Sequence, residues 1–339
     1  MSSNNSDNFS TTTPSLQGGR ERLYPLTFKP ILKERIWGGN KLQTLFGKEL
    51  QSEQTGESWE LSTVKNDISI ISNGSYNGKL FTELISEFPK EVLGEKVYQK
   101  FGKQFPLLLK LLDASDDLSI QVHPNDELAE KRHNSFGKTE MWYIIQADEN
   151  SRNIIGFTEK SSSEQYLEKL KNKELLSILK EEKAQKGDVF FLETGTIHAI
   201  GRGIVLAEIQ QTSDITYRIY DWDRTDNNGN SRELHLDLAL DAINYNPTQT
   251  RKEYSKTENK ENNIIESRYF SVNFIPLNGS LKMLKNQDSF RVYMCTDGSF
   301  SVFCNNEKYD FQKGDTILFP AVLNEFTLEG KAELLEVFV

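Results

Sequence analysis

The segment FPLLLKLLDASDDLSIQVHPND spans residues 105–126 and contains two strand-like runs separated by a polar turn. The first run is apolar except for Lys110, and the second run, LSIQVHP, ends at Pro124. Short runs of this kind, bounded by Asp, Ser and Pro, are typical of β-strands. The turn DASDD predicts that the two strands pair with each other. The segment therefore favours a β fold.

The second run also predicts which side chains lie together. Because side chains alternate between the two faces of a strand, one face of LSIQVHP is apolar and the other is polar. The apolar face consists of Leu118, Ile120 and Val122. The polar face consists of Ser119, Gln121 and His123. Antiparallel sheets often turn a polar face to solvent, so this row fits a wet surface as well as a functional site.

The same signals recur along most of the chain, in short β-branched or aromatic runs between turn residues. Helical spacing of apolar residues is found within residues 80–102 and in SSSEQYLEKLKNKELLSILKEEKA, residues 161–184. We interpret both stretches as helical insertions. The sequence thus predicts a mainly β fold that carries these insertions in its N-terminal part.

Polar stretches indicate where the predicted domains end. Residues 1–20 are rich in Ser, Thr, Asn and Gly, and they predict a flexible tail. Residues 247–263 are polar with few apolar side chains, which makes them the best linker candidate. We therefore expect an N-terminal domain at residues 21–255 and a C-terminal domain at residues 256–339.

A short internal repeat links these two domains. The tripeptide KGD at residues 186–188 opens KGDVFFLETGTIH, and KGD at residues 313–315 opens KGDTILFPAVLNE. In both places a turn precedes a strand and a second turn. Such a duplication predicts two similar β-barrels or sandwiches, with jelly rolls as the preferred form.

Charge and cysteine content narrow the class of protein. The 50 acidic residues outnumber the 40 basic ones and give a net charge of -10, which disfavours nucleic acid or an anionic membrane as a partner. No apolar stretch approaches the ~18 residues needed to span a bilayer.

Asp297-Gly298 is interpreted as a hairpin turn, which would place Cys295 opposite Phe300 rather than Cys304. Two unpaired thiols fit a reducing compartment, so we expect a cytoplasmic location.

The chain contains four histidines, and two of them lie in apolar surroundings. His123 lies in LSIQVHP, and His198 follows a glycine turn in LETGTIHAIG. His133 lies in the charged segment ELAEKRHNSFGK and is interpreted as a surface residue. His235 begins a short amphipathic stretch, where a structural or capping role is expected.

Glu140 adds a third candidate metal ligand to His123 and His198. In GKTEMWYIIQA, Lys138, Glu140 and Trp142 share one face of a predicted strand. Two histidines, one carboxylate and an amide or a water would suit a divalent ion such as Zn²⁺. The ligands are far apart in the sequence, so no local motif identifies the site.

Three further charged residues interrupt apolar strands. Lys110 either extends its ammonium group to solvent or binds an anion, and together with Ser119 it could bind a phosphate group. Glu208, in VLAEIQQ, is either paired structurally or directed into a site. Arg218, in ITYRIYDWD, lies beside tyrosines, where a structural ion pair or a stacking contact is also common.

Together these segments resemble the type I phosphomannose isomerases of the short bacterial kind. The resemblance runs from about Leu23 to the C-terminus. It is carried, in order, by ILKERIWGG, GESWELS, FPLLLKLLDASDDLSIQVHPND, GKTEMWYII, GDVFFLETGTIHAIG and EIQQTSDITYRIYDWDR. The ordered set is specific to this family, although each piece alone is not.

The resemblance implies a zinc-dependent bicupin with one Zn²⁺ per chain. It implies metal ligands at Gln121, His123, Glu140 and His198. It implies a catalytic arginine at Arg218, phosphate contacts at Lys110 and Ser119, and further polar active-site residues at Lys138 and Glu208. The implied reaction interconverts mannose 6-phosphate and fructose 6-phosphate through an enediol, with either Glu208 or Lys138 as the candidate proton carrier.

Two departures from the family pattern affect these expectations. Glu193 stands where the turn before the last metal-binding histidine usually carries proline. In the C-terminal repeat, Glu325 falls where His198 would align, so the second cupin is expected to bind no metal. Two alternatives stay open: a cupin isomerase or epimerase of another sugar phosphate, and a non-catalytic sugar-binding bicupin. The sequence does not indicate an oligomeric state.

Overall fold

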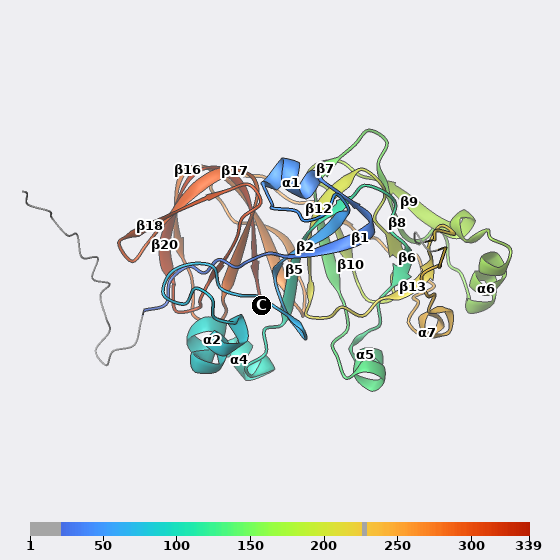
Figure 1. The fold of residues 1–339 in the computed structure, drawn as a ribbon, viewed down its shortest axis with the longest axis horizontal. Helices are drawn as coiled ribbons and strands as arrows, with labels where there is room; N and C mark the ends of the chain where they lie inside the picture. The colour runs from blue at the N-terminus through green and yellow to red at the C-terminus, as the bar shows by residue number, and fades with distance from the viewer. Residues whose placement is uncertain (1–21, 226–228) are drawn as a thin grey trace, which may run out of the picture.

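The computed structural model of the chain describes residues 22–225 and 229–339, and the predicted tail at residues 1–20 lies outside them. Within the described residues, the strands form a seven-stranded, a five-stranded and a six-stranded sheet and a two-stranded ribbon. Figure 1 shows the three large sheets following one another along the longest axis of the molecule. The predicted mainly β class is confirmed.

The seven-stranded sheet lies in the middle of the molecule and has the order β1-β2-β5-β12-β7-β10-β14. Its strands are Ile31–Gly39 (β1), Thr55–Leu61 (β2), Leu107–Ala114 (β5), Ile204–Gln211 (β12), Glu140–Ala147 (β7), Val189–Leu192 (β10) and Arg251–Lys252 (β14). The five-stranded sheet has the order β13-β6-β11-β8-β9. Its strands are Tyr217–Tyr220 (β13), Ile120–Val122 (β6), His198–Ala199 (β11), Arg152–Phe157 (β8) and Leu179–Lys183 (β9).

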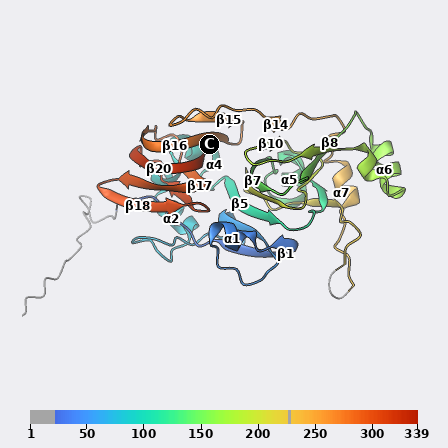
Figure 2. The ribbon, with the colours of Figure 1, turned by 90° about the horizontal axis from the view of Figure 1, so that it is seen from above.

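The six-stranded sheet is built from the C-terminal part of the chain. Its strands are Asn262–Glu266 (β15), Ser271–Leu284 (β16), Arg291–Cys304 (β17), Glu307–Gln312 (β18), Thr316–Phe319 (β19) and Glu325–Phe338 (β20). The remaining ribbon pairs Thr63–Val64 (β3) with Asp67–Ile68 (β4). In Figure 2, β14 and β15 lie along one edge of the molecule, so the predicted linker 247–263 contains the edge strand β14 and the start of the edge strand β15.

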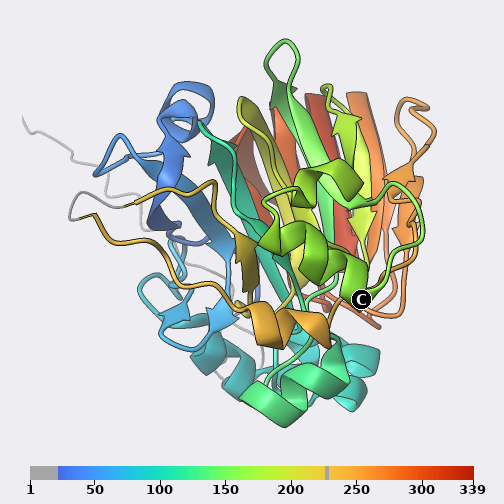
Figure 3. The same cartoon turned by 90° about the vertical axis from the view of Figure 1, so that its right-hand side faces the viewer.

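Helices are short and lie at the margins of the sheets. They are Lys41–Phe46 (α1), Phe81–Glu87 (α2), Pro89–Leu93 (α3), Glu95–Phe101 (α4), Asp126–His133 (α5), Ser163–Lys171 (α6) and Leu236–Leu240 (α7), with a 3₁₀ turn at Leu175–Ile178 (η1). Figure 3 shows α6 in green and α7 in gold in front of the strands. Within the described part of the chain, every helix is too short or too polar to cross a membrane.

One of the two helical predictions needs correction. The single helix predicted over 161–184 ends at Lys171, and the same segment continues as η1 and then as β9. Lys173 has a positive φ of 59°, which breaks the helical path, and β9 gains its hydrogen bonds from β8. The stretch within 80–102 is helical as predicted and consists of α2, α3 and α4, with Pro89 at the start of α3 and Gly94 after its end.

Alternation along β7 assigns its two faces to different cores. Met141 and Tyr143 belong to the core shared with the C-terminal sheet, whereas Trp142 and Ile144 belong to the core between the seven- and five-stranded sheets. Because side chains two residues apart share a face, Glu140 lies on the face of Trp142. Sequence periodicity therefore directs Glu140 into the space between these two sheets.

The polar row of β6 faces the same space. Ile120 and Val122 pack on the opposite side, in the core that includes Tyr166 of α6 and Ala239 of α7. Burial of side chains of this size contributes roughly 1.5–3 kcal/mol each. Leu118 was predicted to share their face, but it belongs to the inner core because it precedes the first residue of β6.

The internal repeat is confirmed in its hydrogen bonds. Gly187 and Gly314 both have a positive φ, of 86° and 92°. In the first copy, the Gln185 amide donates to the Asp188 carboxylate at 2.9 Å. In the second copy, the Gln312 amide donates to the Asp315 carboxylate at 2.8 Å. The strands that follow, β10 and β19, pair with β7 and β17 in the same way.

The hairpin turn predicted at Asp297-Gly298 is wrong. Both residues lie inside the long strand β17, where the pairing with β20 shifts by one residue between Cys295 and Asp297. Gly298 adopts a positive φ of 77°, which suits a bulge as well as a turn. Cys295 and Cys304 are both buried and free, because they lie nine residues apart on one strand.

Candidate active site

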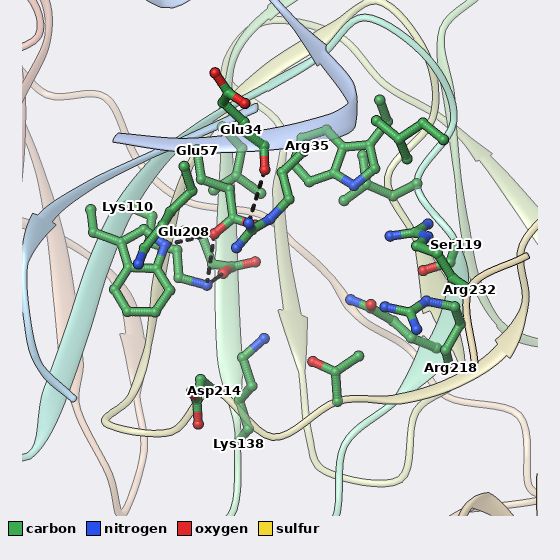
Figure 4. Close-up of a pocket in the computed structure, with 18 of the residues that line it drawn as sticks. Glu34, Arg35, Glu57, Lys110, Ser119, Lys138, Glu208, Asp214, Arg218 and Arg232 are labelled. Atoms are coloured by element: carbon green, nitrogen blue, oxygen red, sulfur yellow. Dashed lines mark hydrogen bonds and ion pairs between the residues drawn. The ribbon is translucent and has the colours of Figure 1, made fainter. Parts of the chain in front are cut away.

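A cavity of about 620 Å³ opens between the seven- and five-stranded sheets. Side chains from both sheets line it, and Figure 4 shows two groups that face each other across the open space. One group contains Glu57, Lys110 and Glu208, and the other contains Ser119 and Arg218. The cavity is of the size that small-molecule sites commonly have.

The wall on the seven-stranded sheet is a row of four side chains in register. Trp59 of β2 lies opposite Lys110 of β5, Lys110 lies opposite Glu208 of β12, and Glu208 lies opposite Trp142 of β7. The Lys110 ammonium group donates to Glu208 Oε1 at 2.8 Å, and Trp142 Nε1 donates to Glu208 Oε2 at 3.1 Å. Both carboxylate oxygens of Glu208 therefore have fixed donors.

The wall on the five-stranded sheet is a second row. Arg218 of β13 lies opposite Gln121 of β6, and Gln121 lies opposite His198 of β11. Ser119 and Gln121 line the cavity, and His123 is only 2% exposed. The solvent-facing interpretation of this polar row is therefore wrong.

Three buried groups converge where the two walls meet. The ligand atoms of His123, Glu140 and His198 all lie within 4.8 Å of one another. His123 Nε2 is 3.4 Å from one oxygen of Glu140, and His198 Nε2 is 3.3 Å from the other. The side-chain amide of Gln121 lies 3.3 Å from His198 Nε2. The candidate ligands predicted from the sequence are thus brought together.

The hydrogen bonds around this group suit a metal ion. His123 Nδ1 donates to the Ile215 carbonyl at 2.9 Å, and His198 Nδ1 donates to the Thr196 carbonyl at 2.8 Å. Such bonds fix the tautomer in which Nε2 is free to bind a metal. One oxygen of Glu140, Oε2, is 2.9 Å from the Lys138 ammonium group, and the other, Oε1, is buried with no hydrogen-bond partner among the described residues. A buried carboxylate that lies between two imidazole nitrogens and keeps an unused oxygen fits a borderline cation such as Zn²⁺.

Burial also keeps the histidines in the form that binds metals. Burial, assisted by the positive charge of Lys138, lowers the pKa of His123 to about 3. Burial likewise lowers the pKa of His198. Both rings are therefore neutral at physiological pH, and protons do not compete with a metal for Nε2 there.

Lys138 lies beside the same group. Its ammonium group is 2.9 Å from Glu140 and 3.0 Å from His123 Nε2. Burial lowers the pKa of Lys138, but the charges of Glu140 and Glu208 outweigh this effect and leave the pKa raised. Lys138 is therefore a cation at neutral pH and can donate hydrogen bonds into the cavity.

Arg218 adjoins the candidate metal ligands through Gln121. Its Nη1 donates to the Glu233 carbonyl at 2.9 Å, while its buried Nε has no hydrogen-bond partner in the described residues. Burial and the nearby charge of Arg232 lower the pKa of Arg218, although an arginine remains protonated near pH 7. A fixed cation with an unused donor can stabilise negative charge that develops in the cavity.

The expected joint role of Lys110 and Ser119 needs revision. They do not lie on paired strands, because Lys110 is on β5 of one sheet and Ser119 precedes β6 of the other. Figure 4 shows them on opposite sides of the cavity. In a double-layered β fold, a short turn such as DASDD can carry the chain from one sheet to the other.

Breaking the Lys110–Glu208 pair is expected to destabilise the fold. Lys110 is 6% exposed and Glu208 is 3% exposed, so Lys110→Met would leave the buried Glu208 carboxylate without its ion-pair partner. We expect the free energy of unfolding to fall by about 3–5 kcal/mol, measured by chemical denaturation. Adding Glu208→Gln should recover most of this loss. Lys41→Met, which removes an exposed pair with Asp148, should cost below about 1 kcal/mol. Equal losses in the two lysine variants would contradict the buried-pair interpretation.

The remaining histidines lie where the sequence places them. His133 is exposed and contacts the Tyr217 hydroxyl at 2.8 Å. His235 precedes α7, and its Nδ1 accepts a hydrogen bond from the Arg218 amide at 3.0 Å. His235 thus supports the strand that carries Arg218, which is a structural role.

Sequence reasoning missed several residues that line the cavity. Glu57 accepts from Arg35 Nε at 2.7 Å and from Trp59 Nε1 at 2.6 Å. Burial raises the pKa of Glu57, but the charges of Lys110 and Arg35 outweigh it and bring the pKa to about 2. The spacing of Glu57 and Trp59 repeats that of Glu140 and Trp142, which is the signal that could have found them. Arg232 lies in an irregular segment and has no such signal.

Family models match two parts of the chain. Residues 26–157 match the family model for the phosphomannose isomerase type I catalytic domain. Residues 260–339 match the family model for the mannose-6-phosphate isomerase cupin domain.

Curated relatives match over nearly the whole chain. The chain is 41% identical over 314 residues to mannose-6-phosphate isomerase ManA of Bacillus subtilis (strain 168), which covers 91% of this chain and 97% of the relative. It is 34% identical over 313 residues to the mannose-6-phosphate isomerase of Streptococcus mutans, with 92% and 97% covered.

Solved structures share the fold. The crystal structure of the mannose 6-phosphate isomerase from Bacillus subtilis superimposes with a TM-score of 0.86 at 35% identity and covers 93% of this chain and 99% of that one. A more distant mannose 6-phosphate isomerase, bound with zinc and yttrium, gives a TM-score of 0.75 at 17% identity. Identity of 41% across 91% of the chain, together with both domain matches, decides the family. The chain belongs to the type I phosphomannose isomerases.

Proposed function

We propose that this protein is a metal-dependent aldose–ketose isomerase that interconverts mannose 6-phosphate and fructose 6-phosphate through an enediol. The observation that carries the proposal is the convergence of His123, Glu140 and His198 within 4.8 Å, next to Gln121 and Lys138, which line the cavity. The names of the curated relatives support the choice of substrate.

We propose that a single Zn²⁺ ion is held by Gln121, His123, Glu140 and His198. The neutral imidazoles and the buried carboxylate with one unused oxygen support this ligand set, and Gln121 would contribute its amide oxygen after a rotation of the amide. When bound, the ion supplies a Lewis acid that stabilises negative charge on the carbonyl oxygen of the sugar. The zinc bound by a distant structural neighbour supports the choice of metal.

The side chains around the proposed metal site would bind the substrate and assist the reaction. Arg218 would stabilise the enediolate or assist ring opening, because its buried Nε is an unused donor. Lys110 and Trp142 hold the Glu208 carboxylate in one orientation. A fixed orientation suits a carboxylate that transfers a proton to or from the substrate. Lys138 would donate hydrogen bonds to sugar oxygens as a permanent cation. Ser119 would contact the phosphate from the opposite wall.

Two alternatives remain distinct from this proposal. An isomerase or epimerase of another sugar phosphate would use the same cavity, and a non-catalytic bicupin would bind sugar without turnover. The buried cluster of His123, Glu140 and His198 favours catalysis, because a protein that only binds sugar has no need of a metal ion with an open coordination position.

We further propose the finer architecture and the location of the protein. The repeated KGD turns support two jelly rolls related by duplication, with the metal-binding one at residues 21–255 and the other at residues 256–339. In the second, Glu325 is exposed and pairs with Lys282 at 2.7 Å. The acidic charge disfavours nucleic acid and anionic membranes as partners, and the free cysteines support a cytoplasmic location.

A coupled assay tests the proposal. The zinc-loaded protein should convert mannose 6-phosphate to fructose 6-phosphate in a phosphoglucose isomerase-linked assay, and a chelator should stop the reaction. Glucose 6-phosphate and ribose 5-phosphate, each followed by NMR without the coupling enzyme, serve as alternative substrates. Faster turnover of either one would support the first alternative, and binding without any turnover would support the second.

A further inference from the structure

The segment that carries Lys138 belongs to no helix or strand. α5 ends at His133 and β7 begins at Glu140, and residues 136–139 between them are irregular. Figure 4 shows the Lys138 side chain directed into the cavity. Its ammonium group lies 2.9 Å from Glu140 and 3.0 Å from His123 Nε2. The position of this cation therefore depends on the bonds that hold an irregular segment.

Two side chains hold the backbone on either side of Lys138. The Gly137 amide donates to Asp126 Oδ1 at 3.0 Å. The Thr139 amide donates to Gln211 Oε1 at 2.9 Å. The side-chain amide of Gln211 in turn donates to the same Asp126 oxygen at 3.0 Å. Asp126 therefore fixes Gly137 directly and Thr139 through Gln211.

The second oxygen of Asp126 is bound by the turn between β15 and β16. The Tyr269 hydroxyl donates to Asp126 Oδ2 at 2.8 Å, and Arg268 Nη2 donates to the same oxygen at 2.9 Å. Tyr269 is half-buried, whereas the Arg268 side chain is 75% exposed, so the hydroxyl is the better ordered donor. Burial raises the pKa of Asp126, but hydrogen bonds from Gln211 and Tyr269 outweigh this effect and leave the pKa lowered. Asp126 is therefore a carboxylate at neutral pH, and it accepts four hydrogen bonds.

Local bonds and core packing fix the place of Tyr269. Ser267 Oγ accepts hydrogen bonds from the amides of Tyr269 and Phe270 at 3.2 and 3.1 Å. Phe270 is 1% exposed and belongs to the core that also contains Met141 and Tyr143 of β7. The six-stranded sheet therefore presents the Tyr269 hydroxyl to Asp126 from an ordered turn that is anchored in the same core as β7.

We infer that Asp126 and Tyr269 are positioning residues for Lys138, so that the six-stranded sheet supports the active site from outside the cavity. This inference rests on the proposed isomerase function. Neither Asp126 nor Tyr269 lines the cavity, so both act through the backbone at residues 137–139. A displacement of about 1 Å in a group that takes part in the reaction can lower the rate about 10²-fold, so a small shift of Lys138 is sufficient.

Steady-state kinetics of the zinc-loaded protein test the inference, with kcat expressed per bound zinc ion. Asp126→Ala should lower kcat about 10- to 100-fold, because Gly137 and Gln211 lose their acceptor. Tyr269→Phe removes one of the four donors to Asp126 and should lower kcat about 3- to 10-fold. KM should stay within about 3-fold of wild type in both variants, because neither side chain lines the cavity.

Two further variants separate positioning from a general loss of stability. Asp126→Asn keeps an oxygen for Gly137 and Gln211, so its kcat should return to within about 3-fold of wild type. Tyr309→Phe is the matched control, because the Tyr309 hydroxyl also bonds a carboxylate, that of Glu307, but does so within β18. This control should leave both kcat and KM unchanged.

Hydrogen exchange of the zinc-loaded protein, followed by mass spectrometry, measures the positioning itself. The amides of residues 137–139 should exchange about 10-fold faster in Asp126→Ala and about 3-fold faster in Tyr269→Phe, while those of β20 stay as in wild type. Unchanged exchange in Tyr269→Phe would overturn the inference, and so would an unchanged kcat in that variant or an equal loss of kcat in Tyr309→Phe. If exchange rises as expected but the wild-type protein does not isomerise mannose 6-phosphate, the positioning of Lys138 stands and the proposed function fails.

Discussion

Replacing His198 with alanine is expected to remove both the metal and the isomerase activity. His198 is 1% exposed, and its Nε2 lies 3.3 Å from Glu140, so in the proposed site it would supply one of two imidazole ligands. Without it, the remaining groups cannot complete a tetrahedral site. We expect kcat/KM to fall by at least about 10³-fold, because Lewis-acid stabilisation contributes several kcal/mol to lowering the barrier.

Metal content, measured by mass spectrometry after dialysis, should fall together with activity. His133→Ala is the matched control, because His133 is exposed and is not one of the proposed metal ligands. His198 also packs against Trp142, with ring centroids 5.4 Å apart, so His198→Gln is made as a variant that leaves a smaller cavity. Full metal content in a folded His198→Ala protein would refute its assignment as a ligand.

Arg218→Ala is expected to lower kcat by about 10²–10³-fold, which is the loss seen when one donor to a developing negative charge is removed. Metal content should not change, because Arg218 reaches the metal ligands only through the strand pairing with Gln121. This separates a catalytic role from the structural ion pair or stacking contact that the sequence left open.

Steady-state kinetics and metal analysis on the same preparation check this prediction. Arg202→Ala removes an exposed arginine that does not line the cavity and should behave as wild type. Arg218→Lys keeps the charge but not the planar donor geometry, so it should recover only part of kcat. An unchanged kcat in Arg218→Ala would show that the arginine serves the fold alone.

Strand alternation predicted much of the site. It correctly placed Ser119 with Gln121, and Lys138 with Glu140, because a two-residue period fixes the face of a side chain whatever the strand pairs with. The same period does not say which strands pair. The sequence therefore predicted that the strands bearing Lys110 and Ser119 are neighbours, whereas they belong to different sheets.

Local turn signals were less informative for a related reason. Asp297-Gly298 has the composition of a hairpin turn, but pairing with the long strand β20 keeps β17 continuous, and the irregularity is a one-residue shift between Cys295 and Asp297. Arg232 had no periodic signal, because its position depends on Asp221 eleven residues earlier and on the bridge between Thr225 and Ser231. Contacts of this kind follow from tertiary packing rather than from local sequence.

Titration of the metal-free protein with Zn²⁺ tests the central claim most directly. Chelated protein, with its metal content verified, is titrated with Zn²⁺ while the conversion of mannose 6-phosphate to fructose 6-phosphate is followed. Activity should be absent at the start, rise in proportion to added metal, and stop rising at one ion per chain. Full activity without detectable metal, or a break at two ions per chain, would contradict a single catalytic metal held by Gln121, His123, Glu140 and His198.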